Sequence, residues 1–148
     1  FYCNCCLRKS DDGKINFIDS IHNTLTLYVH EFSHSVINPL TREFLPLLEN
    51  TVADLLSEMK IPSYNNVETI INEHIIRSLE VVYLKNENKI PNHIECAKKY
   101  RDDCFEEGFV YIDHCIQSLE NYINMIEQYA NFKEYFPQVL KIFKKQGL

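Results

Sequence analysis

Two histidines, four residues apart and with a glutamate after the first, form the pattern His30-Glu31-x-x-His34. Residues four apart on a helix project from the same face, so two imidazole nitrogens in this spacing can reach one metal ion. Zinc in such a site lowers the pKa of a bound water towards ~7 and polarises a substrate carbonyl. The pattern predicts that His30 and His34 are zinc ligands and that Glu31 is the general base. A pair of ordinary surface histidines is the alternative.

The third ligand must come from elsewhere in the chain. Leu40 stands where the three-histidine form of the motif needs its last His, so that form is excluded. A catalytic site then needs a carboxylate from a later helix, with one position left open for water. Glu73 is the best candidate, and an exposed ion pair between Glu73 and Arg77 is the alternative explanation for this residue. The rival ligands are Glu80, Glu68 and His74.

The segment around the motif has the spacing of a helix. Its apolar residues lie at Ile18, Ile21, Leu25, Val29, Phe32 and Val36. We expect this helix to stop at Asn38-Pro39, because proline disfavours the helical region for the residue before it. The histidines lie nearly opposite the apolar stripe. The stripe is therefore expected to pack into a core while the histidines face a cleft.

The rest of the chain reads as a mainly α domain of about six helices. Further helices are expected over 41–60, from an N-cap at Asn66 to 84, and over 93–107, 111–130 and 136–145. Residues 1–7 are β-prone and precede a polar turn at 10–13, so a small N-terminal β element is the most that is expected. We expect residues 1–148 to form a single domain, and from the start at Phe1 we expect it to be a fragment or processed form of a longer protein.

Longer motifs resemble a known group of enzymes. A helix with H-E-x-x-H followed by Asn72-Glu73 on a later helix resembles the gluzincin zinc metallopeptidases. The string HEFSHSVINP at 30–39 is similar to a signature of an uncharacterised bacterial family of proposed zinc peptidases, and Asn72-Glu73-x-x-x-Arg77 and GFVYI at 108–112 match its pattern too. The resemblance implies peptide-bond hydrolysis with ligands His30, His34 and Glu73. It favours Tyr111 over His114 as the donor to the oxyanion of the tetrahedral intermediate.

Composition limits the partners. The formal net charge is −6, which argues against a protein that grips a nucleic-acid backbone. No apolar run reaches the roughly 18 residues that a membrane span needs. The expected partner is a peptide or protein substrate, and the family resemblance favours an extracytoplasmic or secreted location. Six cysteines at 3, 5, 6, 96, 104 and 115 leave disulfides and free thiols equally open.

Two other function classes fit the same residues. In the first, the domain is a non-catalytic zincin-like module that binds a peptide or a protein. In the second, the zinc is structural and is held by four protein ligands with no open position. The intact motif counts against the first of these. The oligomeric state is left open by the sequence.

Overall fold

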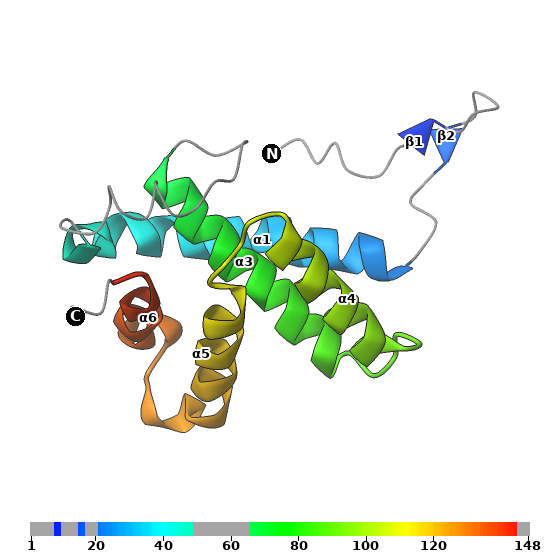
Figure 1. Ribbon diagram of the computed structural model, residues 1–148. Helices are drawn as coiled ribbons and strands as arrows, with labels where there is room; N and C mark the ends of the chain where they lie inside the picture. Colours follow the sequence, from blue (N-terminus) through cyan, green and yellow to red (C-terminus); the bar gives the residue numbers. More distant parts are fainter. Residues whose placement is uncertain (1–7, 10–14, 17–20, 49–65, 145–148) are drawn as a thin grey trace.

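The computed structural model describes residues 8–9, 15–16, 21–48 and 66–144, and these form a mainly α fold (Figure 1). Two short strands, β1 (Arg8–Lys9) and β2 (Ile15–Asn16), pair antiparallel. The α-helices are α1 (Ile21–Phe44), α3 (Val67–Asn86), α4 (His93–Glu106), α5 (Ile112–Asn124) and α6 (Phe132–Leu140). Short 3-10 helices lie at Leu45–Leu48, Ile126–Gln128 and Lys141–Phe143. The β-prone run at 1–7, the turn at 10–13 and most of the helix expected over 41–60 lie outside the described residues.

Helix α1 runs through Pro39, so the expected stop at Asn38-Pro39 is wrong. A proline inside a helix removes one hydrogen bond and costs about 3 kcal/mol or more. Here the residues on both sides of Pro39 are held by packing, because Ile37 and Thr41 are buried at 1% and 0% exposure. Leu40 and Phe44 also pack against the core. Burial on both sides of the proline outweighs its cost, and the helix continues to Phe44.

Helix α3 is the central element of the fold. It crosses α1 and also packs against α4 and α5 (Figure 1). Its start confirms the expected cap, since the side chain of Asn66 accepts a hydrogen bond from the backbone N–H of Thr69 at 3.2 Å. Thirteen of its residues are buried, on every side of the helix. Side chains of α3 therefore face several neighbouring helices at once.

The apolar stripe of α1 packs into the core only in part: Leu25 lies against a core cluster, whereas two later members are exposed, which corrects the expectation from the sequence. Phe32 is 72% exposed and Val36 is 43% exposed. The residues of α1 that are buried among the described part of the chain are Ser33, Ile37 and Thr41, on the side that faces α3. The two motif histidines lie beside this buried face. They are therefore enclosed between helices, whereas Phe32 and Val36 face outward.

The C-terminal helices have different limits from those expected. Helix α4 agrees with the expected range to within a residue, whereas α5 ends at Asn124 and α6 begins at Phe132. The side chain of Asn131 caps α6 by accepting from the backbone N–H of Glu134, and Glu134 accepts in return from the N–H of Ala130. This reciprocal cap starts the helix four residues earlier than expected and leaves Pro137 inside it.

Two clusters of buried apolar side chains lie against α3. One joins α3 to α1 and α6 and includes Ile37, Ile70 and Phe136. The other joins α3 to α4 and α5 and includes Val81 and Leu119. In the described ranges Cys96, Cys104 and Cys115 are free thiols, and Cys3, Cys5 and Cys6 lie outside them. None of the helices in the described part of the chain is long and apolar enough to cross a membrane.

Candidate metal centre

Helices α1 and α3 bring three metal-binding side chains together where they cross. The Nε2 atoms of His30 and His34 lie 3.2 Å apart. An oxygen of Glu73, which comes from α3, lies 3.4 Å from the Nε2 of His34, and its other oxygen lies 3.9 Å from the Nε2 of His30. The ligand atoms of these three residues all lie within 4.8 Å of one another. The structure thus groups the three residues that the sequence analysis named as ligands.

The outer ring nitrogens fix the tautomers of both histidines. The Nδ1 of His30 lies 3.2 Å from a carboxylate oxygen of Glu80, and the Nδ1 of His34 lies 3.2 Å from the side-chain oxygen of Asn38. Both partner atoms are acceptors, so each Nδ1 carries the proton and donates. In a neutral imidazole the Nε2 atom then carries a lone pair. Two lone pairs consequently face each other beside a carboxylate, which is favourable only with a cation among them.

The spacing suits a small tetrahedral ion. Zinc binds imidazole nitrogen at about 2.0–2.1 Å, which places two such ligands about 3.3 Å apart at a tetrahedral angle. The separations of 3.2 Å between the histidines and 3.4 Å between His34 and Glu73 are close to that value. Among the described residues no further His, Cys, Asp or Glu joins this group. The described residues would thus supply three of the four positions around a tetrahedral ion held here.

Charge at the centre also favours a cation. The side chains of Glu73 and Glu80 are only 7% and 5% exposed, and the Nε of Arg77 lies 3.5 Å from an oxygen of Glu73. Burial of uncompensated charge is costly, and one guanidinium cannot balance two carboxylates. Burial lowers the pKa of His30, but the hydrogen bond to Glu80 and the charges of Glu80 and Glu73 outweigh this, so its pKa is raised. The site attracts positive charge, whether proton or metal ion.

Glu31 lies on the same turn of α1, rotated about 100° from His30 around the helix axis. Its side chain is partly buried and makes no hydrogen bond or ion pair with any described residue. Within the described ranges, the flanking glutamate is therefore not engaged by another protein group. This is the condition that a general base needs before it binds a water or a substrate.

The other residues considered from the sequence have different surroundings. Glu68 forms an ion pair with Arg42 at 2.8 Å, and the fully buried ring of His74 packs on Phe109, so neither joins the cluster. Tyr111 lies at the start of α5, and its ring contacts are with His74, His114 and Phe143. The assignment of Tyr111 or His114 as oxyanion donor stays a prediction.

The comparisons with known proteins place the chain in a family. The model of a family described as a domain of unknown function, DUF4932, matches residues 2–142. The chain belongs to the DUF4932 family. No curated protein matches the chain, and no solved structure does. The match covers α1, α3 and α4, so the whole cluster lies within the DUF4932 domain.

Sequence reasoning about this DUF4932 domain gave two of the surrounding residues other roles and missed a third. Glu80 was weighed as a ligand, but it contacts the outer nitrogen of His30. An ion pair with Arg77 was weighed as the alternative to metal binding by Glu73. In the structure Glu73 has both contacts, since it lies beside Arg77 and also faces the histidines. Tyr100 of α4 was missed altogether, although its hydroxyl donates to Glu80 at 2.6 Å. A tyrosine among charged residues on a predicted helix carries no signal of such a contact.

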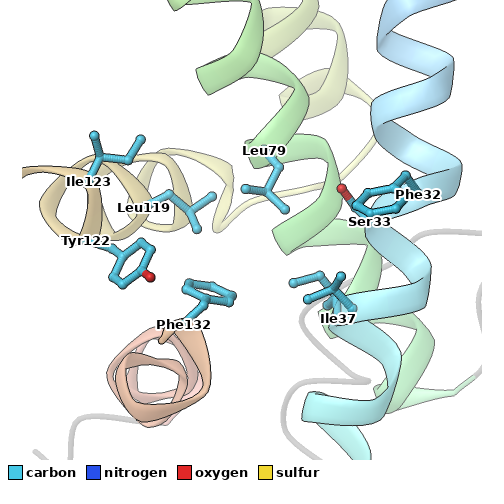
Figure 2. Close-up of a pocket in the computed structure, with 9 residues that line it drawn as sticks. Phe32, Ser33, Ile37, Leu79, Leu119, Tyr122, Ile123 and Phe132 are labelled. Atoms are coloured by element: carbon cyan, nitrogen blue, oxygen red, sulfur yellow. The ribbon is translucent and has the colours of Figure 1, made fainter. Parts of the chain in front are cut away.

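An apolar pocket of about 260 Å³ lies on a different flank of α1 in this DUF4932 domain (Figure 2). Phe32 and Ile37 of α1, Leu79 of α3, Leu119 of α5 and Phe132 of α6 are among the side chains that line it. None of the three clustered ligands lines this pocket. Nothing among the described residues shows what fills it, so we assign it no role in the metal centre.

Proposed function

We propose that this DUF4932 domain is a zinc-dependent peptidase, with His30, His34 and Glu73 as the ligands of the ion. The observation that carries the proposal is the convergence of two Nε2 lone pairs and a buried carboxylate at separations near 3.3 Å. The H-E-x-x-H spacing on a helix and the likeness to the gluzincin pattern support the same conclusion.

Each ligand has a partner that holds its orientation. Glu80 accepts from His30, Asn38 accepts from His34, and Arg77 lies beside Glu73. Partners of this kind are typical of metal sites, where they set the tautomer and direction of the ligands. Ordinary surface histidines have no need of such partners. The side chains of His30 and His34 are also only 18% and 23% exposed, unlike those of typical surface residues.

The proposed reaction is hydrolysis of a peptide bond. A bound zinc ion would polarise the scissile carbonyl and lower the pKa of a coordinated water towards ~7. Glu31 would accept a proton from the attacking water and pass it to the leaving nitrogen, acting as base and then as acid. Tyr111 is the proposed donor to the oxyanion on the basis of the family pattern alone.

Two observations bear on the other classes. A structural zinc site would need a fourth protein ligand, and the described residues supply three. A non-catalytic binding module would have no use for a glutamate that flanks the ligands and is engaged by no described side chain. We therefore favour the peptidase over both.

The test begins with elemental analysis of the purified chain, for which we expect one zinc per molecule. The protein is then incubated with a mixed peptide library before and after removal of the metal by a chelator, and again after zinc is returned. Cleavage that is lost with the metal and restored by zinc is the expected result. Stoichiometric zinc without any cleavage would favour the binding module, and absence of stoichiometric metal would overturn the proposal.

A further inference from the structure

A third helix, α4, contacts the metal centre although it supplies no ligand. The hydroxyl of Tyr100 donates to a carboxylate oxygen of Glu80 at 2.6 Å. The same oxygen of Glu80 lies 3.2 Å from the Nδ1 of His30. Glu80 is therefore held from two sides, by an imidazole of α1 and by a phenol of α4.

The hydroxyl of Tyr100 is also linked to the third ligand. The Nη1 of Arg77 donates to the oxygen of Tyr100 at 3.4 Å, and the Nε of the same guanidinium lies 3.5 Å from Glu73. The guanidinium carbon lies 4.6 Å from the centre of the Phe109 ring, which restricts the arginine from another side. Glu107 also contacts Arg77, but its side chain is largely exposed at 58% and holds the arginine weakly.

These contacts form one continuous path from His30 through Glu80, Tyr100 and Arg77 to Glu73. Each hydrogen bond in it has a defined direction, because Arg77 donates to Tyr100 and Tyr100 donates to Glu80. Burial, with the charge of Glu80, raises the pKa of Tyr100, so the phenol keeps its proton and stays a donor. The hydroxyl of Tyr100 joins Glu80 to Arg77 in this path.

We propose that Tyr100 is a positioning residue of the metal centre, whose hydroxyl fixes Glu80 and Arg77 and through them the two ligands His30 and Glu73. This inference rests on the proposed metal site. A ligand that is fixed before the ion arrives loses less conformational freedom on binding. Tyr100 thus increases the affinity for the ion without touching it.

The alternative is that Tyr100 contributes only packing. Its ring lies against the cluster that contains Val81 and Leu119, and phenylalanine would preserve that contact. Tyr100→Phe therefore separates the two roles. The matched control is Tyr83→Phe, because Tyr83 is another tyrosine at the edge of this cluster whose hydroxyl bonds to a glutamate, Glu87, that takes no part in the metal centre.

The experiment measures zinc affinity by competition with a chromophoric chelator, together with the thermal stability of each metal-free variant. We expect Glu80→Gln to weaken zinc binding about 10- to 100-fold and Tyr100→Phe to weaken it about tenfold. Tyr83→Phe should stay within about twofold of the wild type. The visible spectrum of the Co²⁺-loaded protein should change in Tyr100→Phe and not in Tyr83→Phe, because only the former disturbs the ligand geometry.

Three outcomes would count against the inference. If the zinc affinity and the Co²⁺ spectrum are unchanged in Tyr100→Phe while Glu80→Gln binds zinc weakly, the metal site is supported but Tyr100 has no role in it. Equal losses in both tyrosine variants would indicate a general effect of the substitution. A wild-type chain that binds no metal would overturn the proposed function, and this inference with it. If Tyr100→Phe folds poorly, the zinc affinities of Glu80→Gln, of Arg77→Lys and of the double variant test the same path. Losses of affinity that are not additive in the double variant would support the path, and additive losses would contradict it.

Discussion

The Nε2 atoms of His30 and His34 face each other at 3.2 Å, while the Nδ1 of each ring is bonded to a separate side chain. This relationship is the reason why we propose that the pair forms one site. The outer contacts fix both lone pairs on the inner side of the rings, and Glu73 lies against them from the opposite helix. A cation bound among the three groups would relieve the repulsion between them.

Removal of the carboxylate ligand should abolish tight metal binding. Glu73→Gln keeps the size of the side chain but removes the charge beside the two imidazoles, so we expect the Kd for zinc to rise more than about 100-fold. Isothermal titration calorimetry on metal-free protein provides the measurement. Glu68→Gln on the same helix is the matched control, and equal zinc affinity in the two variants would exclude Glu73 as a ligand.

Substitution of the flanking glutamate should separate binding from catalysis. Glu31→Gln should keep stoichiometric zinc and lower the rate of peptide cleavage about 100- to 10,000-fold, because the group that accepts the proton is gone. Glu43→Gln, an exposed position in the same helix that pairs with Lys133, should leave both properties unchanged. Full activity in Glu31→Gln would require another base.

The contact between Asn38 and His34 predicts a graded series. Asn38→Leu removes the acceptor for the Nδ1 proton of His34, so zinc affinity should fall about tenfold. Asn38→Asp retains an acceptor oxygen and should bind at least as tightly as the wild type. Chelator competition on the two variants measures this, and identical affinities would show that the contact does not orient the ligand.

His74 should make the stability of the metal-free protein depend on pH. Burial lowers the pKa of His74 from 6.5 to about 4, with a further lowering by Arg77 that is opposed by the hydrogen bond to the carbonyl of Ile70. The unfolded chain therefore takes up a proton as the pH falls below 6.5, whereas the folded chain does so only near 4. The stabilisation is complete above pH 6.5 and decreases by about 3 kcal/mol down to pH 4.

Urea unfolding of the wild type and of His74→Leu at a series of pH values measures this contribution. The other groups titrate in both proteins, so the difference between the two curves isolates His74. We expect the wild type to lose about 2–3 kcal/mol more than the variant between pH 7 and pH 4.5. Parallel curves would contradict the lowered pKa.

The orientation of α1 can be tested by two substitutions on opposite sides. Ile37→Ala should cost about 2–5 kcal/mol of unfolding free energy, because Ile37 is 1% exposed in the core beside α3. Phe32→Ser should cost less than about 1 kcal/mol, since Phe32 is 72% exposed. Denaturant unfolding distinguishes these values, and the reverse order would support the core that the sequence pattern suggested.

The parts of the centre that the sequence could predict are those that depend on local spacing. His30 and His34 are paired by one turn of one helix, so their proximity follows from the pattern alone. Glu73 required a resemblance, because its contact with His34 depends on how two helices cross. The side of α1 that is buried was predicted wrongly for the same reason, since Phe32 and Val36 follow helical spacing but the crossing with α3 leaves them exposed.

The residues that support the proposed ligands were harder to predict from the sequence. The role of Tyr100 depends on α4 packing beside α3, which no periodicity within either helix reveals. The passage of α1 through Pro39 likewise depends on burial of Ile37 and Thr41 by other elements. The local rule gives the energetic cost of a proline inside a helix correctly, but it takes no account of the packing by other elements that offsets this cost.

The proposed ligand Glu73 and the supporting residues Arg77 and Glu80 occupy one side of α3 at spacings of four and three residues. A single insertion or deletion between them would rotate the later residues by about 100° and separate the ligand from its supports. Such length changes inside this helix should therefore be incompatible with a working centre. Changes of length in the connection at 87–92 shift no residue of α3 relative to another, so variation among related chains is expected to accumulate there.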